Sequence, residues 1–171
     1  MLLQDVRALL AKAKLPRISP DEPAPDPQLL AQIEAITDSS LDLPEPQKAA
    51  CVRALLWYTA GNLNAAHEIV QPMSGPDGAY IHGMIHRVEG DFDNARYWFS
   101  RAAAHPASAE IYRHAVVNSQ AIAAHPLWDP VYVTDLVEES GTGISEELAT
   151  VLRIEFEELF NYLTDTKTPV I

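Results

Sequence analysis

The sequence predicts an all-α protein, and three observations support this prediction. Apolar residues recur every three or four positions along most of the chain, which is the spacing of one helix face. No stretch alternates polar and apolar residues for long enough to predict a strand. Most of the 13 prolines fall between the apolar runs, where they mark helix boundaries. At 171 residues, the chain suits one helical domain with a sizeable core.

Two helices are expected in the N-terminal region. Residues 2–14 form an amphipathic run with Leu, Val and Ala on one face. Residues 15–27 are rich in proline, which favours extended backbone, so we expect a linker or a surface strap there. A second helix is expected from Pro27, a residue type favoured in the first turn, to just before Thr37.

The C-terminal region, residues 108–164, is also expected to be helical. Asp129 and Ser145 are good N-cap residues, because their side chains can accept hydrogen bonds from the first N–H groups of a helix. The last helix carries one apolar stripe, which we interpret as core packing, with an oligomer interface as the alternative. The expected helices span about 108–124, 130–139 and 145–164.

Two phrases in the centre of the chain share one pattern: GNLNAAH at 61–67 and GDFDNAR at 90–96. Each begins with a glycine, which can adopt the left-handed conformation that ends a helix. The next residue, Asn62 or Asp91, can cap the following helix. A large apolar residue and a small alanine follow, so two helices can pack closely. The pattern predicts two helical hairpins within residues 47–106, the first beginning with a helix over 47–60.

This pattern resembles the centre of the tetratricopeptide repeat, a helix–turn–helix unit of about 34 residues. In the second unit the resemblance extends to Gly83, Phe99, Ala102 and Pro106, where the family prefers a small residue, an aromatic, alanine and proline. The two units are more closely spaced than in the family. The resemblance implies stacked helical hairpins that present a surface to a protein or peptide partner.

The segment HGMIHRVEGDFDNARYWFSR, residues 82–101, has a second resemblance. It is similar to a phrase, roughly HGxxHRxEGDxxNAxYW, that a group of uncharacterised bacterial proteins shares. This resemblance implies membership of that group and implies no activity.

His82 and His86 lie four residues apart, so a helix places both on one face, and Glu89 continues the same stripe. These three side chains could ligate a divalent metal, which would be the only cofactor that the sequence suggests. The metalloprotease form of such a motif has glutamate directly after the first histidine, where this chain has Gly83. Candidates for a fourth ligand are His67, Asp91 and His105.

Two other interpretations of the histidine stripe stay open. We favour a hydrogen-bonded internal network, because polar groups inside a hairpin must be satisfied. Asn94 or Tyr97 would complete that network. A pocket for a small molecule or a peptide is the other interpretation.

Tyr80, Met84 and Arg87 are expected on the face that lines the concave groove of tetratricopeptide proteins. An arginine there can hold a carboxylate through two parallel hydrogen bonds. We nevertheless favour Arg87 as an ion-pair partner, and Trp98 as a core residue rather than an exposed recognition residue. The expected partners of Arg87 are Glu89, Asp91 and Asp93. The expected contacts of a ligand or partner are Tyr80, His82, Met84, His86, Arg87, Glu89, Asn94 and Trp98.

Charge excludes some partner classes. The formal net charge is −12, and no basic stripe is present that could neutralise phosphates, so nucleic acid and anionic membranes are not expected partners. No apolar run approaches the roughly 20 residues of a membrane span. Polar residues interrupt the N-terminal apolar run, which therefore does not resemble a signal peptide. Cys51 is the single cysteine and is expected to be a small core residue, so we expect an acidic cytoplasmic protein.

The sequence contains no complete nucleophile motif or phosphate-binding loop. We therefore expect a non-catalytic interaction or adaptor protein with a helical-repeat scaffold. The alternative is an enzyme, or a protein that binds a small ligand or a metal, with His82, His86 and Glu89 as its site.

Overall fold

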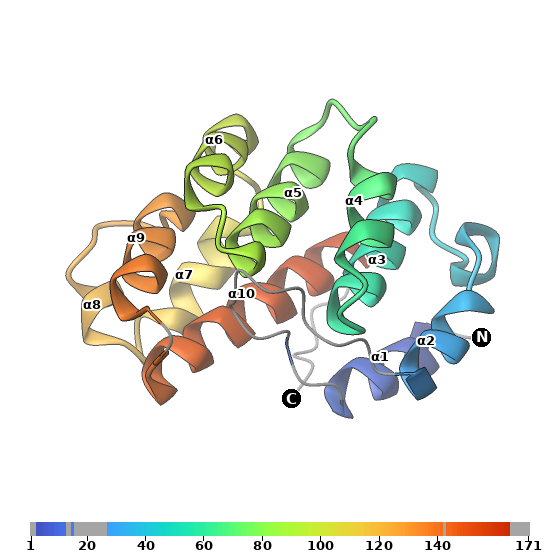
Figure 1. Cartoon of the computed structure of the whole chain (residues 1–171), viewed down its shortest axis with the longest axis horizontal. Helices are drawn as coiled ribbons and strands as arrows, with labels where there is room; N and C mark the ends of the chain where they lie inside the picture. Colours follow the sequence, from blue (N-terminus) through green and yellow to red (C-terminus); the bar gives the residue numbers. More distant parts are fainter. Residues whose placement is uncertain (1–2, 13–14, 16–26, 142, 165–171) are drawn as a thin grey trace.

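The computed structural model describes residues 3–12, 15, 27–141 and 143–164, and all regular secondary structure in those residues is helical (Figure 1). This confirms the all-α prediction. The α-helices are α1 (Leu3–Lys12), α2 (Pro27–Glu34), α3 (Pro46–Thr59), α4 (Leu63–Val70), α5 (Pro76–Glu89), α6 (Phe92–Ala102), α7 (Ser108–Ala115), α8 (Gln120–Ala123), α9 (Pro130–Ser140) and α10 (Glu146–Leu163), with a 3₁₀ helix at Asp38–Leu41.

Helix α1 packs on the same core as the rest of the chain. Val6 and Leu10 are fully buried. Arg7 donates a hydrogen bond of 3.1 Å to Oδ1 of Asn161 in α10, and its guanidinium lies over the ring of Phe160. Most of the expected proline-rich linker, residues 16–26, lies outside the described residues, and Pro27 begins α2 as predicted.

The two glycine turns have the local structure that the sequence predicted. Gly61 and Gly90 adopt positive φ angles of 80° and 78°, in the left-handed region. The Asn62 side chain accepts a hydrogen bond of 3.0 Å from the N–H of Ala65. Asp91 caps the next helix in the same way, from the N–H of Asn94. Helix α3 is therefore followed at once by α4, and α5 by α6, and each pair packs together.

The two helix pairs stand side by side, because α5 contacts both α3 and α4 (Figure 1). Helix α10 extends across both pairs and contacts α3 and α7, while α9 packs against α6. The core is rich in alanine and aliphatic residues, which allow helices to approach closely.

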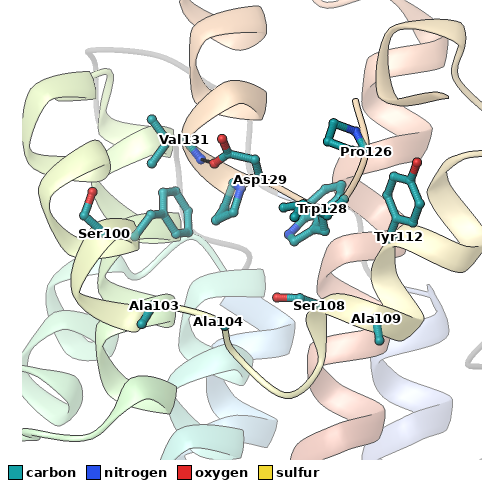
Figure 2. A pocket seen from close by; sticks show the side chains of 13 residues that line it. Ser100, Ala103, Ala104, Ser108, Ala109, Tyr112, Pro126, Trp128, Asp129 and Val131 are labelled. Atoms are coloured by element: carbon teal, nitrogen blue, oxygen red, sulfur yellow. Dashed lines mark hydrogen bonds between the residues drawn. The ribbon is translucent and has the colours of Figure 1, made fainter. Parts of the chain in front are cut away.

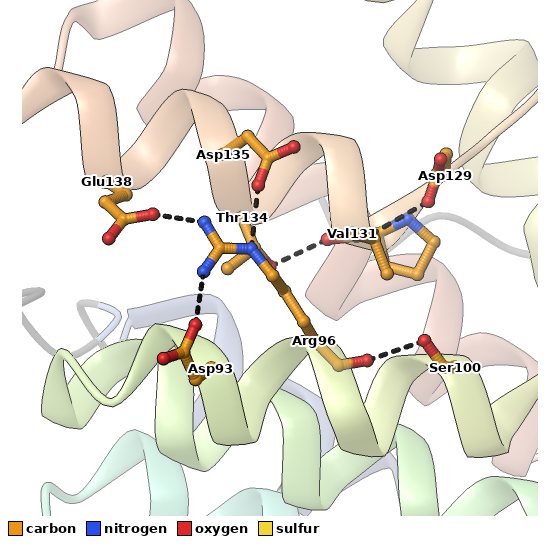
Figure 3. Close-up of polar contacts among 9 residues, drawn as sticks. Asp93, Arg96, Ser100, Asp129, Val131, Thr134, Asp135 and Glu138 are labelled. Carbon is orange, nitrogen blue, oxygen red and sulfur yellow. Dashed lines mark hydrogen bonds and ion pairs between the residues drawn. The ribbon is translucent and has the colours of Figure 1, made fainter.

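Arg96 links α6 to α9 (Figure 3). Its Nε donates a hydrogen bond of 2.8 Å to Oδ1 of Asp135, and it also pairs with Glu138 of α9. On its own helix it pairs with Asp93 at 3.1 Å. Arg96 is thus shared among three carboxylates, so α9 is fixed against α6 by charge as well as by packing.

The structure corrects one expected element. The helix predicted over 108–124 is broken: α7 ends at Ala115, and α8 begins only at Gln120. The break occurs because Ser119 adopts extended backbone and accepts a hydrogen bond of 3.3 Å from the N–H of Ile122, which starts a new helix. Among the described helices, none is both long and apolar enough to cross a lipid bilayer.

Candidate functional site

A sealed ion pair lies between the second helix pair and α10. Arg87 of α5 pairs with Glu155 of α10, and their side chains are 2% and 0% exposed. Tyr80 donates a hydrogen bond of 2.8 Å to the same carboxylate, and Trp128 donates one of 2.8 Å to the Tyr80 hydroxyl. Burial raises the pKa of Tyr80, so the phenol stays protonated and acts as the donor. Burial disfavours the charged guanidinium, but Glu155 outweighs this and raises the pKa of Arg87.

The expectation that Tyr80, Met84 and Arg87 line an open groove is wrong. All three side chains are buried, with exposed fractions of 0%, 1% and 2%. The expected partners of Arg87 in its own hairpin are also wrong, because its carboxylate partner is Glu155, far away in the sequence. Glu155 lies in α10 and Trp128 lies just before α9. Both therefore contact this part of α5 from outside the two helix pairs.

Three histidines converge between α4 and α5. His67 comes from α4, and His82 and His86 come from α5. Each offers a potential metal-ligating atom, and these three atoms lie within 4.8 Å of one another. The Nε2 atoms of His67 and His82 are 2.7 Å apart. The rings of His82 and His86 are parallel, with centroids 5.2 Å apart, and the His67 ring stands nearly perpendicular to both.

Trp98 of α6 supports this cluster. Its ring stacks on His82 with a centroid distance of 3.9 Å and an interplanar angle of 10°. Trp98 is half-buried and packs against the hydrophobic core, so it is neither fully enclosed nor fully exposed. The stacking fixes the plane of the His82 ring.

Acidic side chains border the cluster on the His86 side. Nδ1 of His86 lies 3.0 Å from Glu89 and 3.8 Å from Asp91. The Glu89 carboxylate is within reach of that nitrogen but is poorly aligned for a hydrogen bond. Asn94 bonds to Asp91 at 2.8 Å, so it supports the acidic side chain rather than a histidine.

The other residues that were expected at this site differ in how close to the cluster they lie. Of the candidate fourth ligands, His67 is at the cluster and Asp91 is at its edge, whereas His105 pairs with Asp77 at 2.9 Å. Tyr97 is 53% exposed and its ring contacts Trp98. Of the predicted metal set, His82 and His86 have candidate ligand atoms within 4.8 Å of one another and of a His67 nitrogen, whereas Glu89 lies behind His86.

The buried imidazole of His82 is held neutral. Its pKa is lowered to about 4, mainly by burial, with a further contribution from charge repulsion by the neighbouring His67 and His86. Within the described residues, Nδ1 of His82 has no hydrogen-bond partner. A buried imidazole without a partner for one nitrogen differs from the fully satisfied network that the sequence favoured.

His82 makes the protein sensitive to acid. Its pKa falls from an ordinary value of 6.5 to about 4 on folding, so at intermediate pH the unfolded chain binds a proton that the folded chain does not. Stability is therefore lost as pH falls from 6.5 towards 4, by up to about 3 kcal/mol. Urea unfolding at several pH values, with a metal chelator present, should show a steeper loss for the wild type than for His82→Gln. Parallel curves for the two proteins would contradict this assignment.

A second feature is an apolar groove at the C-terminal end of α6 (Figure 2). It has a volume of about 570 Å³. Small side chains form one side, and Trp128 and Val131 form part of the other. Leu127 at its edge is 61% exposed. The groove is lined by Phe99, Ser100, Ala103, Ala104, Ser108, Ala109, Tyr112, Pro126, Leu127, Trp128, Asp129, Pro130 and Val131.

Sequence reasoning missed this groove, which we call the α6–α7 groove. Its lining comes from three segments: the end of α6, the first turns of α7, and residues 126–131 before and within α9. The only local signal was the run of small residues around Ala103 and Ala104, which leaves space between elements. That signal does not show which other segment faces the alanines.

A smaller polar cluster of Glu110, His114 and Glu158 also has ligand atoms within 4.8 Å of one another. His114 already pairs with Glu158 at 2.5 Å, and Glu110 is exposed and binds Arg113. Ion pairing explains these contacts, so this cluster is a weaker candidate site.

No protein-family model matches the chain, and neither a search of curated proteins nor a search of solved structures found a match.

Proposed function

We propose that this protein is a non-catalytic, tetratricopeptide-like interaction protein that holds an apolar segment of a partner protein in the α6–α7 groove. The observation that supports the proposal most is the groove itself. Its volume of about 570 Å³ falls in the range of about 300–1,000 Å³ that is usual for binding pockets, and its lining is mainly apolar.

The shape of the lining favours side chains inserted from a partner. Ala104 and Ala109 contribute only methyl groups, so larger apolar side chains can enter between them and Trp128. Polar groups are few and lie among Ser100, Ser108 and Asp129. Asp129 already caps α9 by accepting a hydrogen bond of 2.9 Å from the N–H of Val131. Contact in this groove would therefore depend on burial of apolar surface, with little charge recognition.

The net charge of the whole chain suggests what would flank the apolar segment. The chain has 24 acidic and 12 basic residues, so the partner segment is expected to carry lysine or arginine beside its apolar anchors. We further propose that the protein acts in the cytoplasm. The cysteine content supports this, because a single cysteine cannot form an intramolecular disulfide, and such disulfides are typical of secreted proteins.

The test uses peptides selected from a displayed random library on the untagged full-length protein. Selected peptides should combine apolar anchors with basic flanks, and Leu127→Asp or Ala109→Trp should weaken their binding at least about tenfold. Val117→Asp is the matched control, because Val117 is 80% exposed and does not line the groove. Peptides that bind all three variants equally well would show that the groove is not the binding site.

A further inference from the structure

We propose that His67, His82 and His86 form a binding site for one divalent transition-metal ion, with zinc as the best match. The main observation behind this proposal is that three imidazoles from two helices converge. Their candidate ligand atoms all lie within 4.8 Å of one another. Imidazole is a preferred ligand of zinc, copper and nickel, and it is a poor ligand for magnesium or calcium. This inference is independent of the α6–α7 groove, which none of the three histidines lines.

For the His67–His82 pair, the spacing of the two nitrogens requires only a small adjustment to receive the ion. Two nitrogens bound to zinc at 2.0–2.1 Å in a tetrahedron lie about 3.3 Å apart. The Nε2 atoms of His67 and His82 are 2.7 Å apart, so they must separate by well under 1 Å. His67 is half-buried at the edge of α4, so its side chain can make that movement.

Neighbouring side chains border two of the three rings. Trp98 holds the plane of His82 by stacking at 3.9 Å. Glu89 lies 3.0 Å from Nδ1 of His86, which is the place of the carboxylate that orients many metal-binding histidines. With Nδ1 turned towards Glu89, the opposite nitrogen of His86 is left to act as a ligand.

Three protein ligands leave a fourth position on the ion. In zinc sites with three histidines, that position holds water or an exogenous ligand. The ligand set therefore belongs to the open class of zinc sites rather than the closed class with four protein ligands.

The experiment measures zinc binding to the untagged full-length protein after treatment with a chelator, by competition with a chromogenic chelator. We expect one equivalent to bind, and His67→Gln and His86→Gln each to weaken binding at least about 100-fold. Glu89→Gln should weaken it by about 10- to 100-fold, as expected for a residue that orients a ligand. His125→Gln is the matched control, because His125 stacks on Tyr132 outside the cluster, and it should leave the affinity unchanged.

Circular dichroism first establishes that each variant is folded. A second measurement on the wild type needs no variant: zinc should shift the imidazole NMR signals of three of the six histidines. The proposal is overturned if no stoichiometric uptake occurs, if the two ligand variants bind zinc as well as the wild type, or if the shifts spread over other histidines.

Discussion

Arg87→Met is expected to lower the free energy of unfolding by about 3–5 kcal/mol. The substitution removes the guanidinium but leaves the Glu155 carboxylate in a place where its side chain is 0% exposed. Among the described residues, the Tyr80 hydroxyl, 2.8 Å away, would be the one remaining hydrogen-bond donor to that carboxylate. A buried charge with one neutral donor is strongly destabilising, because water cannot replace the missing partner. Urea or guanidinium unfolding measures the loss.

The double variant Arg87→Met with Glu155→Leu separates the charge effect from the packing effect. Removing both charges leaves no buried ion, so the double variant should be more stable than the single one, and within about 2 kcal/mol of the wild type. Arg113→Met is the control for loss of an ion pair in general. Arg113 pairs with Glu110 on an exposed helix surface, and its loss should change stability little. Equal losses for Arg87→Met and Arg113→Met would contradict the sealed ion pair.

Gly83→Val is expected to cost about 3 kcal/mol or more of stability. A Cβ atom at this position would lie 2.7 Å from Cδ1 of Phe99, closer than side chains approach. The ring cannot move aside easily, because Phe99 is 2% exposed and packs against Tyr80 and the Arg87 guanidinium. A side chain in the helix interior would relieve the entropy cost of glycine by at most about 1 kcal/mol, so the clash dominates.

Gly143→Val is the control, since a Cβ there meets only the carbonyl oxygen of Ser140 at 3.9 Å. That change should leave the free energy of unfolding within about 0.5 kcal/mol of the wild type. Phe99→Leu combined with Gly83→Val should recover part of the loss by giving the new side chain room. Thermal or urea unfolding that ranks the two valine variants as equal would show that the helices do not approach as closely as described.

The local structure could be predicted well from the sequence. Gly61 and Gly90 turn the chain, and Asn62 and Asp91 cap the next helices, because those residue types fix local backbone geometry whatever surrounds them. The requirement for a small residue at Gly83 was also visible, and its reason is the contact with Phe99. The turns and caps could be predicted because cause and effect lie within one or two turns of the chain, whereas the small residue at Gly83 was expected only from the repeat resemblance.

The distant contacts could not be predicted in the same way. Arg87 has acidic neighbours in its own hairpin, and nothing local indicates that Glu155 of α10 is its partner instead. His82 and His86 could be placed on one face from their spacing, whereas His67 was one of several candidates until α4 and α5 were placed together. The α6–α7 groove combines three separate segments, so no single stretch of sequence could reveal it.

The polar side chains that α5 directs into the protein thus form two groups with different roles. Arg87 is sealed and stabilises the fold through Glu155, and His82 with His67 and His86 forms a cluster whose outer histidines reach solvent. Anomalous diffraction at the zinc absorption edge, from crystals of the untagged protein grown with one equivalent of zinc, tests this division most directly. The account predicts one strong anomalous peak between the three imidazoles. A peak at Glu110, His114 and Glu158 with none at the histidine cluster, or peaks only at lattice contacts, would contradict it.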